Sequence, residues 1–238
     1  MLRPLALALA MALPQAATAT EARFELQLRG LNAGQLQLRA TRTASAYAAA
    51  ARLETAGVAR LLRRLRFDAT VQGRIQAGQP RPETYREDVD TGRRESRTEI
   101  AWTGGTPRLL RAEPAREPQP WHLDPATQGD ALDPLTVLMQ LLADIPPEAA
   151  CRLDLPLFDG RRRGQVTLAP TTDPSTGTDA PHSCAGEFRR IAGYSEDELA
   201  EARRFPFHLT YAPADDGTLR VAEIEAQSPY GTARLIRR

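Results

Sequence analysis

The sequence predicts a mainly β protein, built as a strongly curved antiparallel sheet or open β-barrel with one buried apolar helix. Three observations predict this fold. Apolar and polar side chains alternate in many short segments, which indicates half-buried strands. Glycine and proline punctuate these segments at intervals of roughly ten residues. One later segment is apolar around most of its helical circumference, and such a helix must be buried.

The first 19 residues have the layout of a secretory signal peptide. Arg3 precedes a short apolar run, which ends in a small-residue site that closes with Ala19. The run is shorter than the roughly 20 residues that span a bilayer. A retained N-terminal anchor is the alternative. We therefore expect export to the periplasm, cleavage after Ala19 and no transmembrane segment in the rest of the chain. Residues 20–238 are expected to form a single β domain.

The first part of this domain is expected to consist of short strands. They cover residues 24–29, 35–39, 47–55, 67–76, 83–89, 96–102 and 108–111. The stretch GVARLLRRLRF, residues 57–67, is basic and amphipathic. We interpret it as a connecting helix with solvated arginines, with contact to an anionic membrane surface as the alternative. The proline-rich residues 113–125 are expected to form a loop.

The buried helix is expected over residues 134–144. Asp133 is a favourable N-cap, and Pro134 suits the first helical position. We expect the helix to plug the open end or concave face of the sheet. Its candidate core or ligand-contacting residues are Leu135, Leu138, Met139 and Leu142.

A hairpin follows, with the sequence CRLDLPLFDGRRRGQVTL over residues 151–168. Asp159-Gly160 predicts a type I′ turn. We interpret the three arginines after it as solvated charges or as charges that guard an exposed strand edge. Anion recognition by Arg161 and Arg163 is the alternative, since guanidinium groups suit that geometry.

The rest of the chain continues the β pattern. After a polar loop over residues 171–181, strands are expected at 184–191, 205–211, 219–226 and 230–236. Between the first two of these strands, Ser195 and Glu198 form a capping-box pattern that opens a short helix.

The only cysteines are Cys151 and Cys184. An even count suggests a disulfide in an exported protein, with two free thiols as the alternative. The Cys-x-x-Cys spacing of redox-active sites is absent.

No catalytic or metal-binding residue is expected. His122, His182 and His208 lie far apart and without metal-ligand spacing, and the G-x-S-x-G and phosphate-loop motifs are absent. The acidic residues of 86–95 lack the spacing of a calcium loop, and we interpret this segment as a charged hairpin end. A net charge of +1 argues against nucleic acid as a partner. We expect a protein that is not an enzyme and needs no cofactor.

Several segments resemble the DUF3108 family of exported bacterial proteins, which has no established activity. They are GLNAGQLQLRA, TGRRESRTEIAW, DPLTVLMQLL, CRLDLPLFDGRRR and SCAGEFRRIAGYS. The most specific features are the paired cysteines, the FDGRRR turn and a CxGxYxxIxGY-like motif with Phe188 at its aromatic position and Gly193-Tyr194 at its end. The resemblance implies export, a Cys151–Cys184 disulfide, a curved sheet and no catalytic residues. The expected fold is also similar to periplasmic lipoprotein carriers of the LolA and LolB type.

Two functions are compatible with this pattern. The first is a non-enzymatic binder or carrier of an apolar, lipid-like or amphiphilic envelope ligand, in which the helix lines or gates a cavity. The alternative is a structural or interaction protein of the cell envelope, with a protein partner and a filled core. An apolar cavity would favour the first function, and a closed core would favour the second.

Overall fold

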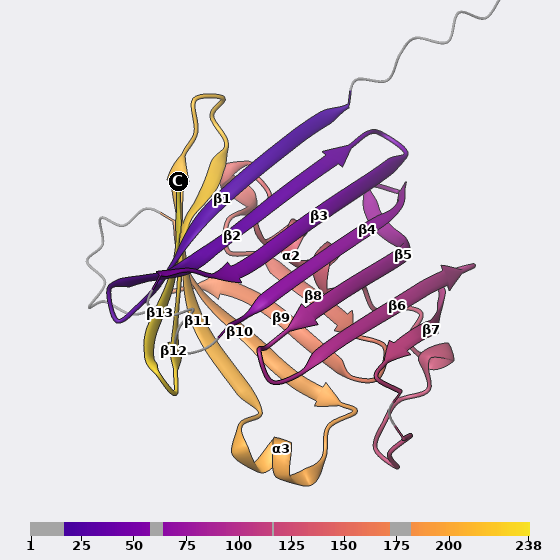
Figure 1. Cartoon of the computed structure of the whole chain (residues 1–238). Coiled ribbons are helices and arrows are strands. Elements are labelled where there is room, and N and C mark those ends of the chain that lie inside the picture. Colours follow the sequence, from indigo (N-terminus) through magenta and orange to yellow (C-terminus); the bar gives the residue numbers. More distant parts are fainter. Residues whose placement is uncertain (1–16, 58–63, 116, 172–181) are drawn as a thin grey trace, which may run out of the picture.

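The computed structural model describes residues 17–57, 64–115, 117–171 and 182–238. Over these residues it confirms the mainly β fold, because thirteen strands form one antiparallel sheet that curves strongly (Figure 1). The strand order is β7-β6-β5-β4-β3-β2-β1-β13-β12-β11-β10-β9-β8. The first and last strands of the chain therefore pair in the middle of the sheet. The edges, β7 and β8, are not paired with each other, so the sheet is not closed.

The N-terminal half of the sheet contains β1 (Thr18–Leu28), β2 (Leu31–Arg42), β3 (Ala46–Thr55), β4 (Arg66–Gln76), β5 (Gln79–Asp90), β6 (Glu95–Thr103) and β7 (Thr106–Glu113). The C-terminal half contains β8 (Leu153–Phe158), β9 (Arg163–Pro170), β10 (Ser183–Ala192), β11 (Arg204–Pro213), β12 (Leu219–Ser228) and β13 (Gly231–Arg237). The helices are α2 (Pro134–Leu141), α3 (Glu196–Glu201) and the short 3-10 helices η1 (Pro125–Thr127) and η2 (Pro147–Ala149).

Alternation along each strand decides which side chains face the concave side. In β3, Tyr47, Ala49 and Ala51 are buried, whereas Ala48 and Ala50 between them are exposed. Successive side chains of a strand point to opposite faces, so the buried set faces inward. Because this pattern is local, most of the strands expected from the sequence are found close to their expected positions.

Small inward side chains leave room for α2 on the concave side. Ala49 and Ala51 of β3 and Ala69 of β4 are buried, and α2 packs against β3, β4, β5 and β8. Figure 1 shows α2 behind the broad face of the sheet. Leu135 and Leu142 of α2 also belong to one continuous hydrophobic core, which includes residues of both halves of the sheet. The helix therefore fills part of the space between the two halves.

The start of α2 is as expected, but its end is not. Asp133 accepts a hydrogen bond from the Thr136 N–H and Pro134 opens the helix. The helix ends at Leu141, three residues before the expected end. Leu142 caps the helix, and after a short turn the backbone of Ile145 forms two hydrogen bonds with Leu219 of β12, at 2.9 and 2.7 Å.

The expected disulfide is present between Cys151 and Cys184, and both residues are buried. Cys184 lies in β10, whereas Cys151 precedes β8 and has a left-handed backbone with φ of 57°. Cys151 therefore lies outside the strand that it was expected to open. The bond ties the segment that carries α2 to the C-terminal half of the sheet.

Some expectations concern positions that the structure does not describe. Residues 1–16 of the expected signal peptide, 58–63 of the basic amphipathic stretch and 172–181 of the expected polar loop lie outside the described residues. Cleavage after Ala19 would remove the first two residues of β1. In the described part of the chain, no helix has the length and apolar character needed to cross a bilayer.

Removal of the disulfide should lower the free energy of unfolding by about 3–4 kcal/mol, because the bond restricts the unfolded chain across a sequence separation of 33 residues. Urea unfolding of the variant Cys151→Ala/Cys184→Ala measures this loss. Reductant should destabilise the wild-type protein by a similar amount and leave the variant unchanged. Equal stability of the wild type with and without reductant would contradict the prediction.

Candidate functional site

Inward side chains around α2 are well buried, whereas those near the α3 end of the sheet are only partly covered. On β11, Leu209 is fully buried, but Phe207, two residues nearer to α3, is half-buried. On β1, Phe24 is 1% exposed, whereas Leu26 is half-buried. The same change occurs on β4 between Ala69 and Phe67. Both halves of the sheet thus leave apolar inward side chains incompletely covered at the same end.

The strand register arranges most of these side chains in two groups. Leu26 lies opposite Leu235 of β13, and Leu235 lies opposite Ile224 of β12. In the N-terminal half, Leu53 of β3 lies opposite Phe67 of β4. We call this half-buried set the apolar mouth; it comprises Leu26, Leu53, Phe67, Phe207, Ile224 and Leu235. In Figure 1 it belongs to the lower end of the sheet, where α3 and the turn between β5 and β6 lie.

A buried polar chain holds α2 at the well-covered end. The Thr136 hydroxyl donates to the Asp133 carboxylate, and the Tyr47 hydroxyl donates to Thr136 Oγ1 across 2.9 Å. Asp133 is fully buried, and this burial raises its pKa to about 6. Burial, followed by the charge of Asp133, also raises the pKa of Tyr47. The network fixes α2 to the start of β3.

A polar group borders the apolar mouth on the N-terminal half. Glu87 faces inward from β5, and the Tyr85 hydroxyl donates to Glu87 Oε2 across 2.7 Å. Burial raises the pKa of Glu87, although hydrogen bonds from Tyr85 and Thr98 act in the opposite direction. Arg161, from the turn between β8 and β9, is close enough for its charge to act on Glu87. Thr98 and Arg161 also line a small hollow beside β6 and β7.

Arg161 differs from the two arginines that follow it. Arg162 forms an ion pair with Glu198 across 2.8 Å, and Arg163 forms a two-bond ion pair with Asp130. Arg161 is half-buried, and this burial lowers its pKa. Within the described part of the chain, no carboxylate lies within ion-pair distance of the Arg161 guanidinium.

The interpretation of this triplet as guards of an exposed edge is wrong. Arg163 begins β9, which is paired on both sides, by β8 and β10. The type I′ turn is also wrong, because Gly160 has a positive φ of 99° but Asp159 does not. Instead, the Asp159 carboxylate accepts hydrogen bonds from the backbone N–H groups of Arg161 and Arg162.

The FDGRRR segment and the end of the CxGxYxxIxGY-like motif are in direct contact. Gly193 has φ of 87°, and a Cβ atom at this position would lie 2.4 Å from the Arg161 carbonyl oxygen. Only glycine allows that approach. Next to it, Arg162 and Arg190 each lie 5.2 Å from the centre of the Tyr194 ring. The capping box of α3 is confirmed, so Glu198 both caps α3 and binds Arg162.

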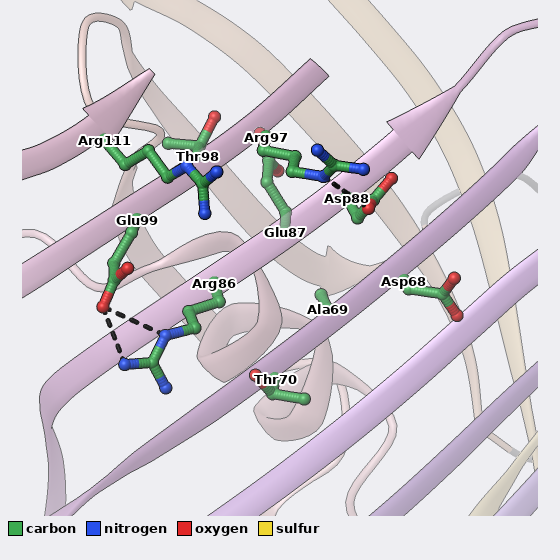
Figure 2. Close-up of a pocket in the computed structure, with 10 residues that line it drawn as sticks. All are labelled: Asp68, Ala69, Thr70, Arg86, Glu87, Asp88, Arg97, Thr98, Glu99 and Arg111. Carbon is green, nitrogen blue, oxygen red and sulfur yellow. Dashed lines mark hydrogen bonds and ion pairs between the residues drawn. The ribbon is translucent and has the colours of Figure 1, made fainter. Parts of the chain in front are cut away.

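A second hollow lies on the outer face of the sheet. It has a volume of about 250 Å³ and is lined by residues of β4, β5, β6 and β7 (Figure 2). Its charges are largely neutralised by ion pairs between neighbouring strands, such as Arg86–Glu99 and Arg97–Asp88. Exposed pairs of this kind are weak and salt-sensitive, and they leave little net charge for a ligand. We therefore regard this hollow as part of a solvated face.

The candidate ligand residues lie in two places. Leu135, Met139 and Leu142 are buried in the core, and Leu138 is half-buried beside it. Arg161 and Arg163 lie at the opposite end of the concave side, on the turn between β8 and β9 and at the start of β9. Ligand contact by these residues stays a prediction.

Sequence reasoning missed Glu87 and the apolar mouth. Glu87 lies in an acidic segment that was interpreted as a charged hairpin end. The alternation of side chains along a strand would have placed Glu87 on the same inward face as Tyr85. Its neighbour Asp88 lies on the outer face, as expected for a solvated hairpin, and forms ion pairs with Arg66 and Arg97. Among the described residues, no group of three or more His, Cys, Asp or Glu side chains could hold a metal ion.

These features define a class of protein: a mainly β domain whose curved, unclosed sheet wraps around a buried helix. The chain belongs to the DUF3108 family, whose model, described as a protein of unknown function, matches residues 23–183. A solved structure, the β-barrel-like protein of the domain of unknown function DUF1849 from Brucella abortus, is similar to the chain at 13% identity and a TM-score of 0.46. That similarity covers 92% of this chain and 94% of the other. No curated protein matches the sequence.

The stability of the protein should depend on the protonation of Asp133. Its pKa is raised from 3.8 to about 6 on folding, so the folded state holds the proton more tightly. The contribution of this proton to the stability of the folded state is complete below about pH 4 and is lost as the pH rises through about 6. Relative to Asp133→Asn, the wild type should therefore lose on the order of 3 kcal/mol of unfolding free energy between about pH 4 and pH 7.

Denaturant unfolding across this pH range measures the difference. Asp130→Asn is the matched control, because Arg163 lowers the pKa of Asp130. Relative to this variant, the wild type should gain unfolding free energy as the pH rises, which is the opposite of the effect at Asp133. A pH-independent difference between the wild type and Asp133→Asn would contradict the prediction.

Proposed function

We propose that this protein is a non-enzymatic binder or carrier of an anionic amphiphilic molecule of the cell envelope. The apolar part of the ligand contacts the apolar mouth, and its acidic group lies near Arg161. The observation that carries the proposal is the change in burial along the concave side. It places half-buried aliphatic and aromatic side chains from both halves of the sheet at one end.

Covering this surface with an apolar chain is favourable because it removes apolar area from water. The core around α2 already fills the opposite end, where Leu135 and Leu142 are 1% exposed. A ligand would therefore enter at the apolar mouth and stop against the helix. In this arrangement α2 forms the floor of the site, and its buried leucines support the ligand indirectly.

Arg161 supports an acidic headgroup. Its guanidinium is half-buried without a carboxylate ion-pair partner in the described chain, and burial disfavours its charge. An anionic group beside it would compensate that cost and form charge-assisted hydrogen bonds. Arg163 is less suited to this role because Asp130 already binds both of its terminal nitrogens.

The disulfide supports export, since such bonds persist mainly in oxidising compartments such as the periplasm. The N-terminal sequence supports the same location. We include cleavage after Ala19 in the proposal, and the mature domain then begins within β1.

Native mass spectrometry of the mature protein, purified gently from the periplasm and then extracted with organic solvent, is the first test. A co-purifying lipid-like mass is expected. A repeatedly clean apo mass, together with no uptake of the probes below, would contradict the proposal and favour the alternative function, an interaction protein of the envelope.

Binding of palmitate and of the uncharged lipid monopalmitoylglycerol separates the two parts of the proposed site. Leu235→Gln should weaken binding of both probes by about tenfold, which corresponds to about 1.4 kcal/mol. Arg161→Gln should weaken palmitate binding selectively. Leu110→Gln is the control, because Leu110 is 55% exposed on β7 and does not belong to the apolar mouth. Equal loss of both probes with Arg161→Gln would contradict the headgroup role.

A further inference from the structure

Two hairpin tips beside the apolar mouth hold large apolar side chains in solvent. Leu31, at the β1–β2 tip, is 73% exposed, and Tyr230, at the β12–β13 tip, is 57% exposed. The tips are joined, because Arg29 donates its backbone N–H to the Thr232 oxygen and its Nε to the Tyr230 oxygen, at 2.9 and 2.5 Å. Leu31 and Tyr230 therefore belong to one connected projection of the sheet.

Leu31 is the first residue of β2, and Tyr230 lies in the turn before β13. A single exposed apolar side chain is ordinary on a protein surface, but here two large ones lie on tips that are joined to each other. Both tips lie at the end of the sheet that carries the apolar mouth, since Leu26 and Leu235 belong to the strands that the tips connect.

Positive charge accompanies these tips. The turn between β5 and β6 lies at the same end and carries Arg93 and Arg94, which are both exposed. Among the described residues, Arg29, Arg93 and Arg94 form no ion pair with a carboxylate. The outer face differs, since Arg86 and Arg97 of the neighbouring strands are both paired there.

Acidic residues also lie at this end. Three of them open α3, which belongs to the C-terminal half, and Glu95 directly follows Arg94 at the β5–β6 turn. Among the described residues of the arc that runs from the β12–β13 tip through the β1–β2 tip to the β5–β6 turn, the arginines without a carboxylate partner are Arg29, Arg93 and Arg94. An anionic surface would be attracted by this arc and not by α3.

We propose that this arc docks on an anionic phospholipid membrane surface. The docking arc comprises Arg29, Leu31, Arg93, Arg94 and Tyr230. Leu31 and Tyr230 enter the headgroup layer, where an aliphatic side chain leaves water and a tyrosine keeps its hydroxyl at the polar boundary. The arginines lie against the lipid phosphates. Docking in this orientation brings the apolar mouth to the membrane.

This inference goes beyond the proposed function and rests on different residues. The mouth residues face the concave side of the sheet, whereas the residues of the arc are exposed on turns and strand ends. A protein that docks without binding a ligand, or binds a ligand without docking, would separate the two proposals.

Co-sedimentation of the full mature chain with vesicles tests the docking arc. Binding to phosphatidylcholine vesicles that contain phosphatidylglycerol should exceed binding to pure phosphatidylcholine by about tenfold and should weaken with salt. The variants Leu31→Ser/Tyr230→Ser and Arg93→Gln/Arg94→Gln should each lose most of this binding. Both variants should keep the wild-type thermal unfolding and the binding of monopalmitoylglycerol, because their side chains are exposed and outside the mouth. The uncharged probe is used here because the charge of Arg94 acts on Arg161.

Two matched variants serve as controls. Leu110→Ser removes an exposed leucine from β7, and Arg81→Gln/Arg108→Gln removes two exposed arginines near the opposite end of the sheet. Both controls should bind vesicles as the wild type does. Absent binding, equal binding to both vesicle types, or equal loss in the controls would overturn the proposal. A change of oligomeric state in Leu31→Ser/Tyr230→Ser, with vesicle binding unchanged, would also overturn it and assign the tips to a contact between copies.

Discussion

The contact between α2 and the alanine-lined inner face of β3 and β4 is the constraint on which the rest of the structure depends. Protein interiors are closely packed, so larger inward side chains at Ala49, Ala51 and Ala69 would displace the helix. The polar chain from Asp133 through Thr136 to Tyr47 then fixes the position of the helix along the strands. Because the helix also contacts the C-terminal half, its position sets the distance between the two halves of the sheet.

The apolar mouth is a consequence of this arrangement. An eight-residue helix is shorter than the strands around it, so it covers the inward face at one end and leaves the other end incompletely covered. The chain then leaves the helix to pair at Ile145 and to form the disulfide at Cys151, which holds the crossing segment against the C-terminal half. The same geometry that stabilises the core therefore creates the surface to which we assign ligand binding.

The charged residues divide according to the face on which they lie. Outer-face arginines such as Arg86 and Arg97 pair with carboxylates of neighbouring strands, which keeps a broad sheet surface solvated and nearly neutral. Arginines at the mouth end are less completely paired, and Arg161 is also half-buried. If a ligand headgroup meets Arg161 and lipid phosphates meet Arg93 and Arg94, one end of the protein performs both binding and docking.

The sequence by itself determined the strands, the helix start at Asp133-Pro134 and the capping box at Ser195, because alternation and capping depend on residues within one or two turns of the chain. It also predicted the disulfide. Only the tertiary structure decided that β9 is internal, that Arg162 and Arg163 are paired, and that Glu87 borders a half-buried apolar surface. These properties depend on which distant segments become neighbours. The order of strands around α2 decides that, and no local pattern in the sequence records it.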